Sequence, residues 1–118
     1  LPLLEGASRL RDLWFYNNFL TGTIPETYSL LEDCVYFELD GNMLTGTIPS
    51  SLGNLQRVQQ LLLFNNMLSG TLPATLAQLT HVQRLFCDKN YLTGTLPSEF
   101  SNMTSLTHLQ ISDNHFTG

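Results

Sequence analysis

The sequence predicts a repeat solenoid, in which short parallel strands stack into a sheet and short return segments close each coil. Three observations predict it: one stretch recurs, the recurrence has a fixed spacing, and the apolar residues change period within each unit. The clearest copy of the stretch is Asn66–Pro73. Equivalent asparagines recur every 24 residues, at Asn18, Asn42, Asn66, Asn90 and Asn114. A fixed period of about 20–50 residues is typical of solenoids and repeat arrays.

Read with this period, the chain forms a single array. Residues 1–9 are a degraded partial repeat, full repeats occupy 10–33, 34–57, 58–81 and 82–105, and residues 106–118 begin a truncated unit. Each rung of such an array contacts only its neighbours, so stacking is needed to bury the apolar edge of each coil. No apolar run approaches the length of a membrane-spanning helix, and no secretion signal opens the chain. We expect the sequence to be a piece of a longer protein.

Each unit begins with a predicted short strand. In the third unit Leu61 and Leu63 alternate with Gln60 and Leu62. A period of two places alternate side chains on opposite faces of a sheet, so Leu61 and Leu63 should point inward. The equivalent inward pairs are Leu13/Phe15, Phe37/Leu39, Leu85/Cys87 and Leu109/Ile111. Stacked rungs would then form a parallel sheet with a spacing of about 4.8 Å.

A second extended piece and a return segment complete each unit. Gly70 is expected where the backbone packs too closely for a side chain. Pro73 cannot donate to a ladder, and its fixed φ suits the start of a helical turn. After the equivalent Pro49, apolar residues recur at every third position, which matches a 3₁₀ helix better than an α-helix. We therefore expect 3₁₀-like return segments.

The repeated asparagines are expected to form a structural ladder. A buried amide without partners costs about 1–3 kcal/mol, so each side chain should bond backbone groups where the strand ends. Asn65, one residue before Asn66, is expected to point outward and to contribute little to stability. Cys34 and Cys87 occupy core positions two rungs apart. That separation is about 10 Å and exceeds the reach of a disulfide, so both should be free thiols.

These units resemble the plant-specific class of leucine-rich repeat, which reads LxxLxLxxNxLxGxIPxxLxxLxx. The agreement spans residues 10–118, although the paired-cysteine caps of the class are absent at both ends. The resemblance implies an α/β-type, right-handed leucine-rich-repeat superhelix with its parallel β-sheet on the concave, partner-binding face and 3₁₀ or irregular returns on the convex face. The class is common in ectodomains of receptor-like kinases and receptor-like proteins and in polygalacturonase inhibitors. The resemblance therefore implies secretion or the extracellular side of the plasma membrane.

Composition and motifs argue against several function classes. The net charge is −5 and the five basic residues look scattered along the sequence, which argues against nucleic acid binding. No nucleophile motif or phosphate-binding glycine loop appears, so we expect no enzyme activity and no cofactor in this segment. His108, Asp113 and His115 differ in repeat position, so solvated surface residues are favoured over a metal site. A kinase domain in a longer parent protein stays open, and no membrane contact is expected for this segment.

The outward strand positions are the non-repeating part of the sequence. Five aromatic and four charged residues share this face, and they are the candidate ligand-binding residues: Trp14, Tyr16, Tyr36, Glu38, Asp40, Phe64, Phe86, Asp88 and Lys89. Exposed apolar patches with a polar rim tend to be partner sites, and aromatic residues supply binding hot spots. We expect a peptide or protein ligand, although stacking aromatics would also suit a carbohydrate. The alternative is that these side chains only support one another along the sheet.

Two further features concern the flank and the surface. Hydroxyl residues form two outward columns, Thr21/Thr45/Ser69/Thr93 and Thr23/Thr47/Thr71/Thr95. Flat threonine arrays resemble those of some ice-binding solenoids, so a structural scaffold or an ice-binding solenoid is the alternative to ligand recognition. Asn102 begins the only Asn-x-Ser/Thr sequon and would be a glycosylation site in a secreted parent.

Overall fold

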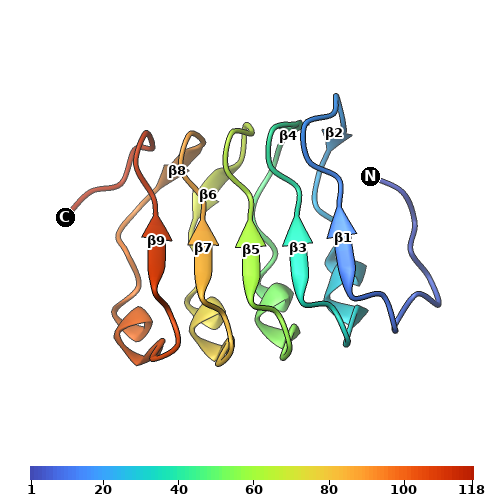
Figure 1. Ribbon diagram of the computed structural model, residues 1–118. Coiled ribbons are helices and arrows are strands. Elements are labelled where there is room, and N and C mark those ends of the chain that lie inside the picture. The colour runs from blue at the N-terminus through green and yellow to red at the C-terminus, as the bar shows by residue number, and fades with distance from the viewer.

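The computed structural model describes residues 1–118 and has the predicted architecture, a solenoid of stacked rungs (Figure 1). One strand from each rung joins a five-stranded parallel sheet in chain order. Its strands are β1 (Asp12–Trp14), β3 (Tyr36–Glu38), β5 (Gln60–Leu62), β7 (Arg84–Phe86) and β9 (His108–Gln110). The register repeats with the sequence period, since Leu13 pairs with Phe37, Phe37 with Leu61, and Leu61 with Leu85. The solenoid prediction is confirmed.

The return segments are 3₁₀ helices, as the three-residue spacing predicts. They are η1 (Glu26–Leu30), η2 (Ser50–Asn54), η3 (Ala74–Gln78) and η4 (Ser98–Asn102), and a proline precedes each of them. Pro73 has φ −66° and ψ 131°, and its carbonyl accepts the first helical hydrogen bond, from Leu76 N at 3.1 Å. Proline suits this place because its missing N–H is not needed at the start of a helix. No helix in the structure is both long enough and apolar enough to cross a membrane.

A second set of short strands connects the sheet to the return segments. These strands are β2 (Thr21–Gly22), β4 (Met43–Leu44), β6 (Ser69–Thr71) and β8 (Tyr91–Thr93), and they form two small parallel pairs. Their register is offset, because Thr21 pairs with Met43 and Ser69 with Tyr91, a separation of 22 residues rather than the 24 of the main sheet. The second extended piece was predicted; this stagger between neighbouring rungs was not.

The inward faces of all rungs merge into one hydrophobic core. Leu61, Leu63 and Leu68 are completely buried in the third rung, and the same inward positions are buried in the rungs beside it. Tyr28 and Phe37 fill places where the repeat class has leucine or isoleucine, and their rings pack edge to face with centroids 6.2 Å apart. The Tyr28 hydroxyl donates a 2.6 Å hydrogen bond to the carbonyl of Pro2. This bond ties the partial repeat to the first full rung.

The predicted asparagine ladder is present. The Asn66 amide Nδ2 donates to the carbonyls of Leu39 and Leu63 at 3.0 and 3.1 Å, and its Oδ1 accepts a hydrogen bond from Leu44 N at 3.0 Å. One side chain therefore satisfies backbone groups of its own rung and of the rung before it. Asn42 and Asn90 make the same pattern of bonds, whereas Asn18 only donates.

Two glycines are required for different reasons. Gly70 has φ +76°, and a Cβ on it would lie 2.9 Å from the Thr47 methyl of the preceding rung, so conformation and space both exclude a side chain. Gly53 lies in η2, and a Cβ there would overlap the backbone carbonyl of Thr75 in η3. Gly53 thus allows two neighbouring return segments to pack closely.

Both cysteines are free and buried, as predicted. Burial raises the pKa of the Cys34 thiol, and likewise that of Cys87, to about 12. The thiolate is the reactive form of cysteine, so both thiols are unreactive at neutral pH. They serve as small core residues.

Candidate ligand-binding face

The outward side chains of the five-stranded sheet form a continuous surface, which we call the sheet face. Because the strands are parallel and in register, equivalent residues of successive rungs lie side by side in rows. The first row is Asp12, Tyr36, Gln60, Arg84 and His108, and the second is Trp14, Glu38, Leu62, Phe86 and Gln110. A third row follows where the strands end, with Tyr16, Asp40, Phe64, Asp88 and Ser112 at the equivalent positions. The inward and outward assignment made from sequence is therefore confirmed.

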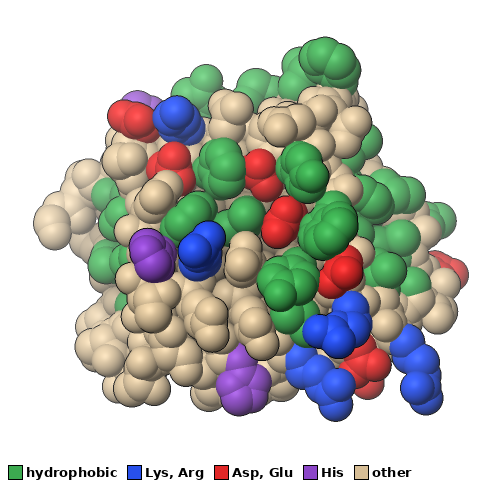
Figure 2. All heavy atoms as spheres, viewed as in Figure 1, with side chains coloured by type: hydrophobic (Ala, Val, Ile, Leu, Met, Phe, Trp, Pro, Cys, Tyr) green, Lys and Arg blue, Asp and Glu red, His purple; other side chains and the backbone are tan.

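Aromatic side chains of this face are available to solvent. Trp14 and Tyr16 are 56% and 45% exposed, whereas Tyr36, Phe64 and Phe86 are half-buried. The Phe64 and Phe86 rings pack against each other at a tilt, with centroids 6.3 Å apart, so lateral support accounts for part of their burial. Figure 2 shows hydrophobic and acidic side chains alternating over the ends of the strands.

Two of the candidate acids are less accessible than their outward direction suggests. Asp40 and Asp88 are only 7% and 8% exposed, so little of either carboxylate is open to solvent. Both lie in the third row, where rungs about 4.8 Å apart place a short aspartate directly beside the larger Phe64 ring. In each carboxyl group Oδ1 is buried and has no hydrogen-bond partner.

Burial raises the pKa of two acids of the sheet face, Asp40 and Glu38. Desolvation raises the pKa of Asp40 above its ordinary value. The pKa of Glu38 is also raised, first by burial and then by the nearby charges of Asp40 and Asp12. An unpartnered buried oxygen has lost its hydration without replacement. Asp40 and Asp88 therefore each keep an unmet capacity to accept a hydrogen bond next to the aromatic rings.

The residue after the third row has a left-handed backbone. Asn17, Asn65, Lys89 and Asp113 have φ between 52° and 55°, and Gly41 has φ 68° at the same repeat position. Asparagine, aspartate and glycine tolerate this region better than other residues do. Asn65 is exposed, as expected, but its left-handed conformation restricts which residues can replace it. Lys89, the one candidate cation of the sheet face, is exposed at this turn.

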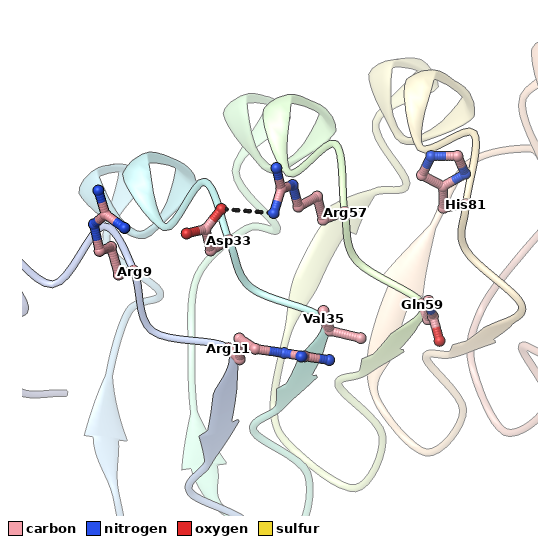
Figure 3. Close-up of a pocket in the computed structure, with 7 residues that line it drawn as sticks. All are labelled: Arg9, Arg11, Asp33, Val35, Arg57, Gln59 and His81. Atoms are coloured by element: carbon pink, nitrogen blue, oxygen red, sulfur yellow. Dashed lines mark ion pairs between the residues drawn. The ribbon is translucent and has the colours of Figure 1, made fainter.

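The aromatic part of the sheet face is not hollowed. The three surface hollows lie elsewhere. One of them, with a volume of about 450 Å³, lies beside the starts of β1, β3 and β5 and is lined by basic side chains (Figure 3). It is lined by Arg9, Arg11 and Arg57, which look scattered along the sequence. Tabulating the sequence by repeat position would have revealed them, because Arg9 and Arg57 are equivalent residues two units apart.

Sequence reasoning also missed a row of exposed apolar residues after the ladder asparagines. Phe19 is 89% exposed, and Met43, Met67 and Tyr91 follow it at the same repeat position. The Tyr91 ring stacks on His115 of the next rung, with centroids 6.1 Å apart. The pattern was visible in the repeated stretch, but the residues differ in type and so did not stand out as a row.

The remaining sequence-based candidates are on the surface. Asn102 is exposed at the end of η4, where a glycan would have room. The threonine and serine side chains of the two flank columns are exposed as expected. The structure contains no group of three or more His, Cys, Asp or Glu side chains that could hold a metal ion.

Comparison with known proteins agrees with this architecture. The Leucine Rich Repeat family model matches residues 9–31, 34–55, 57–79 and 81–103. No curated protein sequence matches the chain. Among solved structures, the plant peptide hormone receptor RGFR1 in complex with RGF2 is similar over 96% of this chain and 18% of its own, with 38% identity and a TM-score of 0.94.

Two Arabidopsis structures are also similar, with somewhat lower identity. The receptor kinase HAESA, in complex with the peptide hormone IDA and the co-receptor SERK1, is 31% identical over 94% of this chain and 19% of its own, with a TM-score of 0.91. The BIR3–SERK2 complex is 30% identical over 97% of this chain and 61% of the matched chain, with a TM-score of 0.89. The chain thus spans less than a fifth of the length of the two receptors. It belongs to the leucine-rich repeat family, and its repeats are of the type found in plant receptor-kinase ectodomains.

Proposed function

We propose that this chain is a ligand-recognition module of a leucine-rich-repeat receptor, either a receptor-like kinase or a receptor-like protein, or of a secreted binding protein. It binds a peptide or protein across the sheet face, on the concave side of the superhelix. The observation that carries the proposal is the set of exposed aromatics, led by Trp14 and Tyr16, on a face whose residues change from rung to rung. Aromatic side chains combine large contact area with few rotatable bonds, which suits a binding surface.

Several observations support a flat, extended ligand rather than a small molecule. The aromatic residues of the sheet face line no pocket, whereas small-molecule sites are concave cavities. Third-row residues on next-but-one rungs lie about 10 Å apart, so a ligand crossing the rungs would meet aromatics and acids in turn. Glu38, a half-buried carboxylate of the same face, would accept hydrogen bonds from donors on such a ligand.

The comparisons support the same proposal. Two of the similar structures are named as complexes of a plant receptor with a peptide hormone. By analogy we place this chain on the extracellular side of the plasma membrane or in the secreted fraction, with Asn102 as its glycosylation site. Leucine-rich-repeat ectodomains are typically non-enzymatic, and we assign no catalytic role to this segment.

A selection experiment tests the proposal. Random twelve-residue peptides displayed on phage would be selected against the wild-type chain, and the selected peptides would be measured against Phe64→Ala, Trp14→Ala and Thr71→Ala. The proposal expects both aromatic changes to weaken binding and the flank change Thr71→Ala to leave it unaltered. Selected peptides whose affinity falls with Thr71→Ala but survives both aromatic changes would move the site off the sheet face.

An ice-binding function is the second candidate, favoured by the exposed hydroxyl columns. Within the first column, however, the Thr45 and Thr93 hydroxyls reach carbonyls of the preceding rung at 3.5 and 3.4 Å. In the second, the Thr47 and Thr71 methyls face glycines of the next rung. Both columns thus already have a framework role. Thermal hysteresis of the wild-type chain, abolished by Thr47→Lys with Thr71→Lys, would revive this candidate.

A further inference from the structure

The basic hollow beside the strand starts is a separate feature of the molecule. Its walls come from two repeat positions: the turn after each return segment, which carries Arg9, Arg57 and His81, and the residue before each strand, which carries Arg11 and Val35. Figure 3 shows these side chains on neighbouring rungs around one opening. Figure 2 shows Lys and Arg side chains gathered at the same corner of the molecule, below β1 and β3.

The hollow holds an excess of positive charge. Three of the chain's five Lys and Arg residues line it, although the net charge of the chain is −5. The molecule's one ion pair joins Arg57 Nη1 to Asp33 Oδ1 at 3.0 Å, and it is partly exposed. Arg9 and Arg11 therefore have no carboxylate partner in the protein. Their guanidinium groups remain available to an external anion.

The backbone beneath the hollow is fixed by the rung-to-rung ladder. Val35 N donates to the Arg11 carbonyl and Gln59 N donates to the Val35 carbonyl, both at 2.8 Å. Asp33 N donates to the Ser8 carbonyl at 3.2 Å, which holds the turns of neighbouring rungs together. Arg11 and Val35 are thus attached to ordered backbone. A site of this kind loses less entropy on binding than one built on a mobile loop.

We propose that this hollow is a carboxylate-binding subsite that receives acidic side chains of a peptide or protein partner. A guanidinium group presents N–H donors in a planar arrangement that matches the two oxygens of a carboxylate. Two such groups without an ion-pair partner, those of Arg9 and Arg11, lie at this opening. The proposal takes from the proposed function only that the partner is a polypeptide. It adds that the partner carries acidic residues at the end that lies over the strand starts.

Charge on the neighbouring sheet face favours a polypeptide over a polyanionic carbohydrate. Asp12 and Glu38 lie on the strands directly after the hollow, with Asp40 in the row beyond. A uniformly anionic chain would be repelled there, whereas a peptide can be acidic at one end and basic or polar at the other. From Arg11 to the third row is five residues, about 16 Å along a strand. A peptide that crosses the rungs at the third row would therefore reach the hollow with a further segment of about five extended residues.

An NMR titration tests the subsite directly. The Nε–Hε signals of the arginine side chains would be followed while acetyl-Gly-Glu-Glu-Gly-amide, which has no terminal charges, is added to the wild-type chain. The subsite predicts saturable shifts at Arg9 and Arg11 in the millimolar range, with much smaller shifts at Arg84 on the sheet face. Shifts that stay linear in peptide concentration, or that are equal at Arg84, would overturn it.

Two variants and one competitor complete the design. In the double variant Arg9→Gln with Arg11→Gln, peptide binding is followed through the Nε–Hε signal of Arg57. The affinity should fall by more than about fivefold, because both unpaired guanidinium groups are lost. The control Arg84→Gln should leave the affinity unchanged. Unaltered binding in the double variant would contradict the proposal, as would tighter binding of digalacturonate than of the peptide. The titration does not depend on the aromatic residues of the sheet face. Its failure would contradict the carboxylate subsite alone, whereas a failure of the phage selection would contradict the proposed function.

Discussion

The sheet face and the flank formed by the second strands are built from the same coils but differ in what they repeat. On the flank, threonine or serine recurs on each full rung beside a glycine, and the side chains bond or pack against the neighbouring rung. On the sheet face, tryptophan, glutamate, leucine and phenylalanine follow one another in a single row. Residues that stack identically in each unit serve the framework, whereas residues that vary on an exposed surface are free to recognise a partner.

The largest expected effect contrasts two adjacent leucines of one strand. Leu61 is fully buried and Leu62 is half-buried on the sheet face. Leu61→Ala should lower the free energy of unfolding by about 2–5 kcal/mol, because it removes buried methyl groups and leaves a cavity. Leu62→Ala should cost about 1 kcal/mol, since less of its surface is withdrawn from water. Urea denaturation measures both, and equal losses would mean that the faces are not divided as described.

The asparagine ladder should be the next most sensitive part of the framework. Asn66→Ala removes three hydrogen bonds to buried backbone groups, so it should cost about 1–3 kcal/mol in the same urea measurement. The matched variant is Asn18→Ala in the first rung, where the side chain is exposed and only donates. A loss at Asn18 as large as that at Asn66 would show that the ladder does not act through buried groups.

The left-handed turn gives a smaller and more specific effect. Asn65→Ala should cost about 1 kcal/mol, because alanine is less stable than asparagine at φ 55°. Asn65→Gly should stay within about 0.5 kcal/mol of wild type, as Gly41 occupies the same repeat position. If the two substitutions destabilised the chain equally in thermal melts, loss of the side chain rather than of the conformation would be responsible.

Asp40, a buried acid of the sheet face, should make stability depend on pH. Because the folded-state pKa of Asp40 is raised by burial, the folded chain holds this proton more tightly than the unfolded chain does. The destabilisation from Asp40 is therefore fully present above its folded pKa and is relieved as pH falls through that value. Asp40→Asn should raise the melting temperature at pH 7, and its advantage over wild type should shrink as the pH is lowered towards 4. An advantage that is constant with pH would show that the charge is not responsible.

The framework was predictable from sequence because it depends on period. Alternation identified Leu61 and Leu63 as inward, a spacing of three identified the 3₁₀ returns, and a polar residue between apolar ones identified the Asn66 ladder. Each of these features is local and is repeated in the next unit. Because each pattern recurs in every full unit, the sequence contains several independent examples of each predicted feature.

The degree of burial of each outward side chain, and its contacts with the neighbouring rungs, were harder to predict. Alternation gives the direction of Asp40 but not its exposure, which depends on how far the rings of the rungs beside it extend. The left-handed φ of Asn65 was missed because asparagine also occurs at ordinary surface positions. The residues Asn17, Gly41 and Asp113 at the same repeat position together indicate a turn. Arg9 and Arg57 are far apart in sequence and meet only because the coil returns to the same position two rungs later.

Binding and stability measured together on one pair of variants test the central claim that the sheet face recognises the ligand. With a phage-selected peptide, Phe64→Ala should weaken binding by about 1–3 kcal/mol, or roughly 5–150-fold in Kd. Its cost in stability should be about 1 kcal/mol, as for Leu62→Ala, because Phe64 is also half-buried. Thr71→Ala, on the exposed flank, should change stability by less than about 0.5 kcal/mol and leave Kd unaltered. Unchanged affinity in Phe64→Ala together with a loss of affinity in Thr71→Ala would contradict the account.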